Sequence, residues 1–217
     1  MTVRSRSSQR AGCGIRWPEA SRRRIRANEV NERSAMSRRW LWLLLPATAL
    51  TLLATSSCST TWPRRDPIGE ILPTITGTSL ADDPVTLPDF GGGEPLLLLV
   101  GYVQAAQFDL DRWLLGLDQL GWQTRTLEVP TLPGMMPRMF RGFIDGGMRR
   151  GIPEEDWAAV VTVYGEAHKL AEFTGNEGTN NGRILLLDGD GRVVFYHDRG
   201  YSVASLNKLV AARAAVQ

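Results

Sequence analysis

The chain has 217 residues, of which 22% are charged and 43% hydrophobic, and its formal net charge is +2. The charge is unevenly distributed, because residues 1–35 contain nine arginines and three glutamates, whereas residues 58–217 contain 14 basic and 20 acidic residues. The second part is therefore acidic and lacks the positive surface that binding to nucleic acid requires, which excludes that class of function for it. Its length is enough for one globular domain.

Residues 1–35 fit no targeting class well, since they are rich in arginine and poor in large apolar residues. We expect this segment to be disordered or to be a mis-annotated leader, with translation beginning at Met36. A genuine basic arm that binds nucleic acid or anionic lipid is the alternative.

Residues 36–57 have the layout of a secretory signal peptide. Arg38 and Arg39 form a basic head, residues 40–53 form an apolar core, and the small residues 54–57 lie directly before Cys58. This order of charge, apolar core and small residues is typical of export signals. The core is short for a bilayer span, which needs about 20 apolar residues.

A cysteine directly after small residues resembles the lipobox of bacterial lipoproteins, although Thr55 stands where that family prefers leucine. The resemblance implies that Cys58 is acylated and becomes the new N-terminus, so that a lipid anchors the domain to a membrane of the cell envelope, facing the periplasm. Ser59 after it, rather than aspartate, favours an outer membrane if the cell has one. The alternative is an ordinary secretory signal or an uncleaved anchor, with Cys58 incidental.

We interpret residues 58–69 as a polar tether and residues 70–217 as the folded domain. The sequence predicts a short strand near residues 85–87 and then a continuous apolar strand within residues 95–103, a run typical of strands buried on both faces. A helix is expected over residues 107–121, with Phe108, Trp113 and Leu117 on its apolar face and Asp109 on the opposite face.

The rest of the domain continues this alternation of helices and strands. The predicted elements are a strand at 122–129, a helical stretch at 133–150, a turn or helical cap at 154–157, a β-rich segment at 158–164, a short helix at 166–173, a loop at 174–182, a β-hairpin formed by 183–188 and 192–197, and a last helix at 203–215 that Ser202 can cap. We therefore expect an α/β fold with a mixed central sheet flanked by helices.

This order, with the hairpin at 184–194 and Gly200 after it, resembles the thioredoxin-like superfamily in its peroxiredoxin-type branch, over about residues 70–215. The resemblance implies a catalytic cysteine just after the strand that ends at Val103. The residues found there are Gln104, Ala105, Ala106 and Gln107, and the position of the family's cis-proline is occupied by Gly182 and Arg183. A weaker resemblance, which includes Trp113, is to the thioredoxin-like assembly factors of mitochondrial ATP synthase.

Methionines and arginines gather in the second helical stretch. Three interpretations are open: a helix whose apolar face packs on the sheet, a docking face for a protein partner or a membrane surface, or soft-metal binding by thioethers. We expect no metal, since neither cysteine nor histidine lies near in sequence. The candidate partner-binding residues are Met135, Met136, Arg138, Met139, Phe140 and Arg141.

Both cysteines, at positions 13 and 58, precede the predicted domain, so the domain has no thiol for dithiol redox chemistry. We therefore expect a non-catalytic, membrane-anchored protein without a cofactor that binds a protein partner, as an assembly factor or scaffold. The alternatives are an enzyme of another chemistry that uses His168 or His197, and a degenerate redox protein that borrows a thiol from glutathione or a partner.

Overall fold

A computed structural model describes residues 61–216, and the predicted leader, signal peptide and Cys58 lie outside these residues. The central sheet has four strands in the order β4-β3-β6-β7, of which β3 and β4 are parallel and the other neighbours antiparallel. The strands are β3 (Leu96–Gly101), β4 (Arg125–Pro130), β6 (Arg183–Leu187) and β7 (Val193–His197).

The connections between these strands define the fold. The helix α2 (Gln107–Gln119) links the parallel pair β3 and β4, α5 (Ala167–Thr174) leads into the hairpin of β6 and β7, and α6 (Val203–Ala214) follows that hairpin. This strand order and connectivity are those of a thioredoxin-like α/β fold, so the predicted fold class is confirmed.

A second sheet extends the first beyond β4. Its order is β2-β1-β5, formed by β1 (Ile75–Ser79), β2 (Pro84–Leu87) and β5 (Val161–Thr162). Parallel bridges from Glu128 to Val160 and from Thr131 to Val163 connect it to the first sheet. The sequence did not predict β1, because its residues ITGTS lack strand-like alternation and the strand depends on pairing with β2 and β5.

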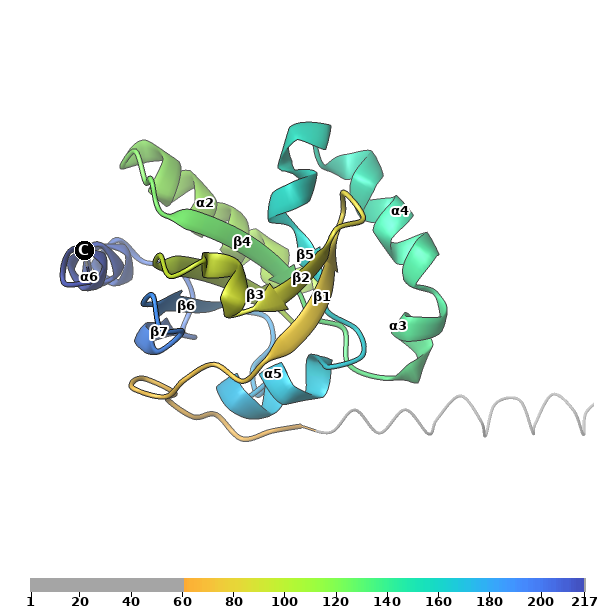
Figure 1. The fold of residues 1–217 in the computed structure, drawn as a ribbon, viewed down its shortest axis with the longest axis horizontal. Helices are drawn as coiled ribbons and strands as arrows, with labels where there is room; N and C mark the ends of the chain where they lie inside the picture. The colour runs from red at the N-terminus through yellow and green to blue at the C-terminus, as the bar shows by residue number, and fades with distance from the viewer. Residues whose placement is uncertain (1–60, 217) are drawn as a thin grey trace, which may run out of the picture. The chain divides into compact units, whose positions relative to one another are not determined.

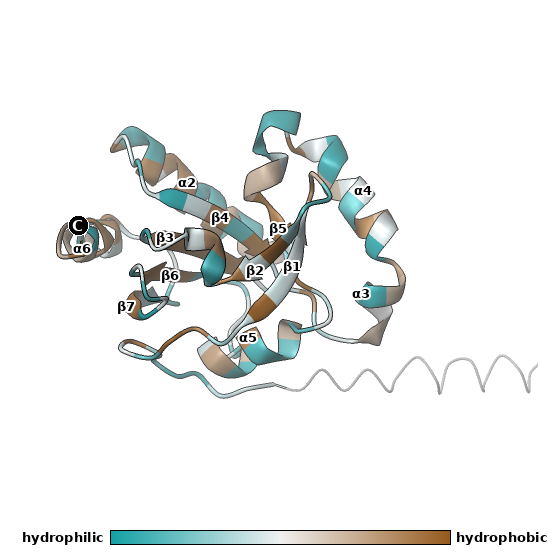
Figure 2. Ribbon diagram, viewed as in Figure 1, coloured by the Kyte–Doolittle hydropathy of each residue, from teal (hydrophilic) through white to brown (hydrophobic). Residues whose placement is uncertain are grey.

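The central sheet is covered on both faces, as Figure 1 shows. Leu97 and Leu99 pack with α2 and α6, whereas Leu98 and Val100 pack with α5 and the β1–β2 hairpin. This double burial explains why β3 and β6 are continuous apolar runs, which Figure 2 marks as hydrophobic.

The predicted helical stretch at 133–150 consists of two helices, α3 (Met135–Met139) and α4 (Arg141–Gly151), which follow β4. Three 3-10 helices complete the described elements: η1 (Asp89–Gly91), η2 (Gln104–Ala106) and η3 (Glu154–Ala159). No helix within residues 61–216 is long and apolar enough to cross a membrane.

Candidate functional site

The site that the resemblance indicated lies in the loop after β3, formed by residues 103–108 (the 103–108 loop). Gln104, Ala105 and Ala106 form η2, and Gln107 begins α2. Gln104 and Ala105 are exposed, Ala106 is buried, and Gln107 is half-buried. The four predicted residues therefore form one short turn at the carboxyl end of β3.

The predicted apolar face of α2 is wrong at the start of the helix, where Phe108 faces solvent and Asp109 faces inward. Phe108 is 76% exposed, whereas Asp109 is 1% exposed and lies on the inner face with Leu110, Trp113 and Leu117. The reason is that Asp109 accepts hydrogen bonds from one buried and one part-buried backbone N–H, which the local pattern does not reveal.

Asp109 links the 103–108 loop to two other segments. Its Oδ2 accepts a hydrogen bond from the Gly182 N–H at 3.0 Å, and its Oδ1 accepts one from the Tyr201 N–H at 2.7 Å. Arg112 lies at 3.4 Å from the same Oδ1. One carboxylate thus fixes the start of α2 against the segments before β6 and before α6.

Arg183 holds the loop formed by residues 175–182 (the 175–182 loop) in place by hydrogen bonds. Its side chain is fully buried, and its guanidinium donates hydrogen bonds to four backbone carbonyls of this loop, those of Gly175, Glu177, Gly178 and Asn181. It also lies 5.7 Å from the centre of the Tyr102 ring. The position where the family has a cis-proline is therefore occupied by a glycine that Asp109 binds and an arginine that holds the loop.

Tyr102, at the end of β3, closes this buried network. Its hydroxyl is 2.7 Å from the Thr174 hydroxyl at the end of α5. Burial raises the pKa of Tyr102 above its ordinary value, although the hydrogen bond with Thr174 acts in the opposite direction. Tyr102 therefore remains a neutral structural group that connects β3 to α5.

A carboxyl group lies beside the 103–108 loop on β4. Burial raises the pKa of Glu128, the Asp111 carboxylate acts in the same direction, and a hydrogen bond with Gln107 acts against both. Gln107 also donates to Asp111 Oδ1 at 3.0 Å. Gln107 is thus hydrogen-bonded to both acids, Glu128 and Asp111.

The 103–108 loop exposes three apolar side chains beside the exposed Gln104. Val103 is 41% exposed, and Phe108 projects from the first turn of α2. Ala105 is exposed between them. A small apolar surface therefore lies on a segment that is fixed from below by Asp109, and such a surface is suited to contact with another molecule.

The two histidines of the domain lie in different surroundings. His197 lies 5.7 Å from Trp113 between ring centres, and its Nε2 is 2.8 Å from the Gly200 carbonyl oxygen. His168 is exposed and lines a shallow cavity of about 270 Å³ together with Met135, Arg138 and Tyr164. No carboxylate lines this cavity among the described residues, and no cluster of three or more metal-ligating His, Cys, Asp or Glu occurs there.

The methionine and arginine residues predicted for partner binding do not pack on the sheet. Met135 is 77%, Met139 is 68% and Phe140 is 52% exposed. Arg138 and Arg141 are exposed as well, whereas the side chain of Met136 lies outside the described part. The interpretation of this stretch as a helix that buries its apolar face is therefore wrong, and α4 has no buried residue.

Sequence reasoning missed Asp109, Arg183 and Glu128 as site residues. A charged residue at the first position of the buried run at 183–187 was the available signal for Arg183, and an acid within the alternation of β4 was the signal for Glu128. Asp109 had no comparable signal, since acids are common near the start of helices.

The chain is similar to several solved structures at low sequence identity. No known protein family and no curated protein match the sequence. The thioredoxin domain of a thiol-disulfide oxidoreductase from Bacteroides vulgatus is 19% identical, with a TM-score of 0.46 over 70% of this chain and 100% of that one. A SCO1/SenC family lipoprotein from Bacillus anthracis is 11% identical, with a TM-score of 0.48 over 71% of this chain and 99% of that one.

The pneumococcal exposed lipoprotein thioredoxin of Streptococcus pneumoniae is also similar, at 12% identity and a TM-score of 0.45 over 64% of this chain and 98% of that one. Two of the three are thioredoxins or thioredoxin domains by name, and two of the three are lipoproteins by name. The domain is thioredoxin-like in its strand order and connections, and residues 104–107, which follow β3, contain no cysteine.

Proposed function

We propose that this protein is a lipoprotein of the cell envelope whose thioredoxin-like domain binds a protein partner and does not catalyse thiol chemistry. Acylated Cys58 anchors it to the membrane, and the domain faces the periplasm. An assembly factor or scaffold is the role that fits such a protein.

The observation that carries this proposal is the combination found at the 103–108 loop. The loop has no thiol, and neither glutamine nor alanine can replace a thiolate as the nucleophile of disulfide exchange. The same loop presents Val103 and Phe108 to solvent on a support fixed by Asp109. An apolar segment of a partner protein is the ligand that this surface favours.

The test is capture of a partner from crosslinked membranes by the full-length protein and by a Phe108→Ala variant. We expect the variant to lose the partner because it removes the largest exposed apolar group of the loop. Leu115→Ala is the matched control, since Leu115 is 58% exposed further along the same helix. Equal capture by all three proteins would contradict the proposed surface.

Lipidation and redox activity are tested separately. Radioactive palmitate should label the wild type and fail to label Cys58→Ala; equal labelling would refute the anchor. Insulin reduction and glutathione-dependent thiol transfer should both stay at background level. A clear rate in either assay would replace a binding role with that of a redox protein that borrows a thiol.

An enzyme of non-dithiol chemistry remains the second candidate, and the raised pKa of Glu128 beside the 103–108 loop favours it. If this candidate is correct, Glu128→Gln abolishes the enzymatic turnover. Asp118→Asn, a change on the exposed part of α2, leaves the turnover intact.

A further inference from the structure

The segment that follows the predicted lipid anchor is bound to the domain. We call residues 62–72 the strap. Trp62 N–H donates to Asn176 Oδ1 at 2.6 Å, and Asn176 N–H donates back to the Trp62 carbonyl at 3.1 Å. The Arg64 Nε forms an ion pair at 2.7 Å with Asp198, whose side chain is only 8% exposed. Detaching Arg64 would leave a buried carboxylate poorly compensated, so this contact is costly to break.

Two further features hold the strap in place. Its second half pairs with the backbone at the start of β7, through Gly69 N–H to the Val193 carbonyl at 2.8 Å and Val193 N–H to the Glu70 carbonyl at 2.9 Å. A Cβ on Gly175 would lie 2.5 Å from the Pro63 carbonyl oxygen, so the strap and the 175–182 loop are in direct backbone contact. The part of the predicted tether that the structure describes therefore lies along the domain.

This attachment limits the distance between the lipid and the domain. Cys58 precedes Trp62 by four residues, which span at most about 14 Å even when fully extended. An acyl chain on Cys58 would therefore hold the surface around Trp62 and Glu177 close to the lipid headgroups, and the domain could not swing on a long tether.

The pair α3–α4 is attached to the domain largely by polar contacts. Tyr164 donates to Asp145 Oδ1 at 2.7 Å, and Arg149 donates to the Leu80 carbonyl at 2.7 Å and to Asp82 at 2.6 Å. Ile144 and Met148 are half-buried on the same side. The large apolar side chains that remain exposed make the outer face of α3–α4 suited to an apolar environment.

That outer face combines apolar and basic side chains. Met135, Met139 and Phe143 recur every four residues, and Phe143 is 78% exposed. Arg138 and Arg141 lie between them, are exposed, and form no ion pair within the described part of the chain. Exposed apolar groups with interspersed arginines are typical of helices that lie in the headgroup region of an anionic bilayer.

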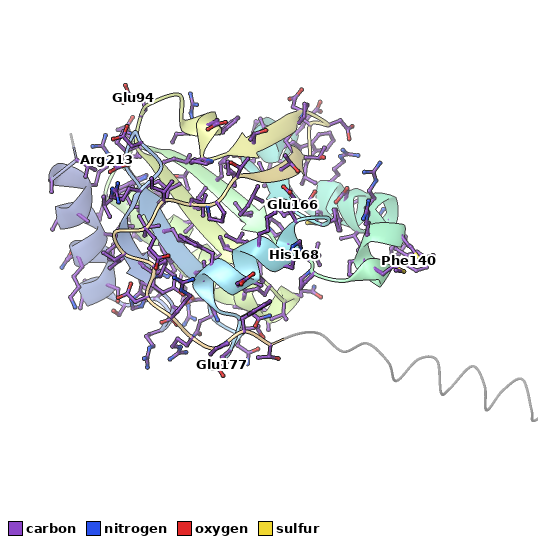
Figure 3. The ribbon with its side chains drawn as sticks, turned by 60° about the horizontal axis from the view of Figure 1, so that its bottom comes forward. Glu94, Phe140, Glu166, His168, Glu177 and Arg213 are labelled. Atoms are coloured by element: carbon purple, nitrogen blue, oxygen red, sulfur yellow. The ribbon has the colours of Figure 1, made fainter. Side chains whose placement is uncertain are left out.

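The strap and α3 lie at opposite ends of the same helix, α5. The strap contacts Gly175 and Asn176 directly after this helix ends, and Met135 and Arg138 share a cavity with His168 near its start. An eight-residue helix is only about 12 Å long. Figure 3, which brings this side forward, shows Glu177, His168 and Phe140 in that order across the molecule.

We propose that the protein lies on an anionic membrane in one fixed orientation, with the strap, α5 and the outer face of α3–α4 against the headgroups. The lipid on Cys58 supplies one attachment and α3–α4 the second; the first rests on the proposed function. Arg138 and Arg141 attract the α3–α4 end of this face to an anionic surface. The α5 end carries the exposed Glu172 and Glu177, so the lipid on Cys58 holds that end.

The orientation is tested with the lipidated protein in vesicles of phosphatidylglycerol and phosphatidylethanolamine. Since acylation uses Cys58, one introduced cysteine can carry a fluorophore, at Phe140→Cys, at Glu177→Cys or at Glu94→Cys. Glu94 lies in the loop before β3, away from the other two positions in Figure 3. Headgroup-labelled quencher lipids should quench the first two strongly and the third weakly. Equal quenching at Phe140→Cys and Glu94→Cys would overturn the proposal.

The second attachment is tested without the lipid. A soluble Cys58→Ala protein that lacks residues before it should float with phosphatidylglycerol vesicles and not with phosphatidylcholine vesicles. Arg141→Ala should weaken this binding about fivefold, as expected for one basic residue at an anionic surface. Arg213→Ala, far from this face in Figure 3, is the control.

The outcomes separate the two proposals. Equal palmitate labelling of the wild type and Cys58→Ala, or no labelling of either, together with intact flotation would refute the anchor and leave the α3–α4 contact standing. No flotation with any vesicle, together with photocrosslinking from position 140 to a protein in native membranes, would overturn the membrane contact in favour of a protein partner. No flotation and no such crosslink would overturn it as well.

Discussion

Replacing Asp109 with alanine should destabilise the domain strongly. The carboxylate accepts hydrogen bonds from the buried N–H of Gly182 at 3.0 Å and from the part-buried N–H of Tyr201 at 2.7 Å. Alanine cannot accept either bond, so both N–H groups lose their acceptor.

The magnitude follows from the two lost acceptors. A buried donor without a partner costs about 1–3 kcal/mol, and bonds to a charged acceptor lie in the upper part of that range. The desolvation of the carboxylate, which alanine avoids, offsets part of the loss. We expect Asp109→Ala to lower the free energy of unfolding by about 3 kcal/mol, and Asp109→Asn, which keeps one acceptor, by about 2 kcal/mol.

The assay is urea unfolding of the Cys58→Ala protein, with the free energy obtained from the midpoint at constant slope. Asp111→Ala is the matched control, because Asp111 has the same charge two residues further along α2 and is exposed; its effect should stay within about 0.5 kcal/mol. Faster hydrogen exchange at Gly182 and Tyr201 should accompany the loss. Equal destabilisation by Asp109→Ala and Asp111→Ala would refute the proposed role of the buried carboxylate.

Three other predictions concern charge and backbone. Hydrogen bonds with Lys169 and Thr76 lower the pKa of Glu166 to about 2, so its contribution to stability is present above the ordinary glutamate pKa and disappears as the pH falls toward 2; Glu166→Gln should flatten acid unfolding curves in that range. The pKa of Glu128 is raised, so its charge costs stability at neutral pH; Glu128→Gln should raise the urea midpoint at pH 7, with a gain that shrinks in acid. Gly175→Ala should release the strap and speed tryptic cleavage near Arg64, whereas Gly178→Ala, which has a similar positive φ but no backbone clash, should not; equal cleavage would contradict the backbone contact.

The parts of the fold that follow from local patterns could be predicted from the sequence. Buried runs such as Leu96–Gly101 and the hairpin with its Gly189-Asp190-Gly191 turn carry their signal within a few residues, and Ser202 caps α6 by accepting from Ser205 N–H as expected. The connection through α2 is long enough to join two parallel strands, which is how β3 and β4 pair.

The parts that depend on distant segments could not be predicted. Asp109 looked like a solvent-exposed first-turn acid, because its partners Gly182 and Tyr201 are 73 and 92 residues away in the chain. The same limitation applies to α3–α4, where an apolar pattern alone does not say whether a sheet, a partner or a membrane covers it. The contacts of Asp145 and Arg149 settle which side of α4 faces the domain.

The buried charges are consistent with the binding function that we propose. Asp109 and Arg183 are both removed from water, which costs stability unless every polar atom finds a partner, and both use their partners to fix the loops at the carboxyl end of β3. A thioredoxin-like enzyme fixes those loops around a reactive thiol. Here the same region holds an exposed phenylalanine on a fixed turn, with residues 104–107 in place of the nucleophile. A surface whose shape is maintained without a reactive group fits the binding role that we propose, and a strap that fixes the domain at its anchor would present that surface in one direction.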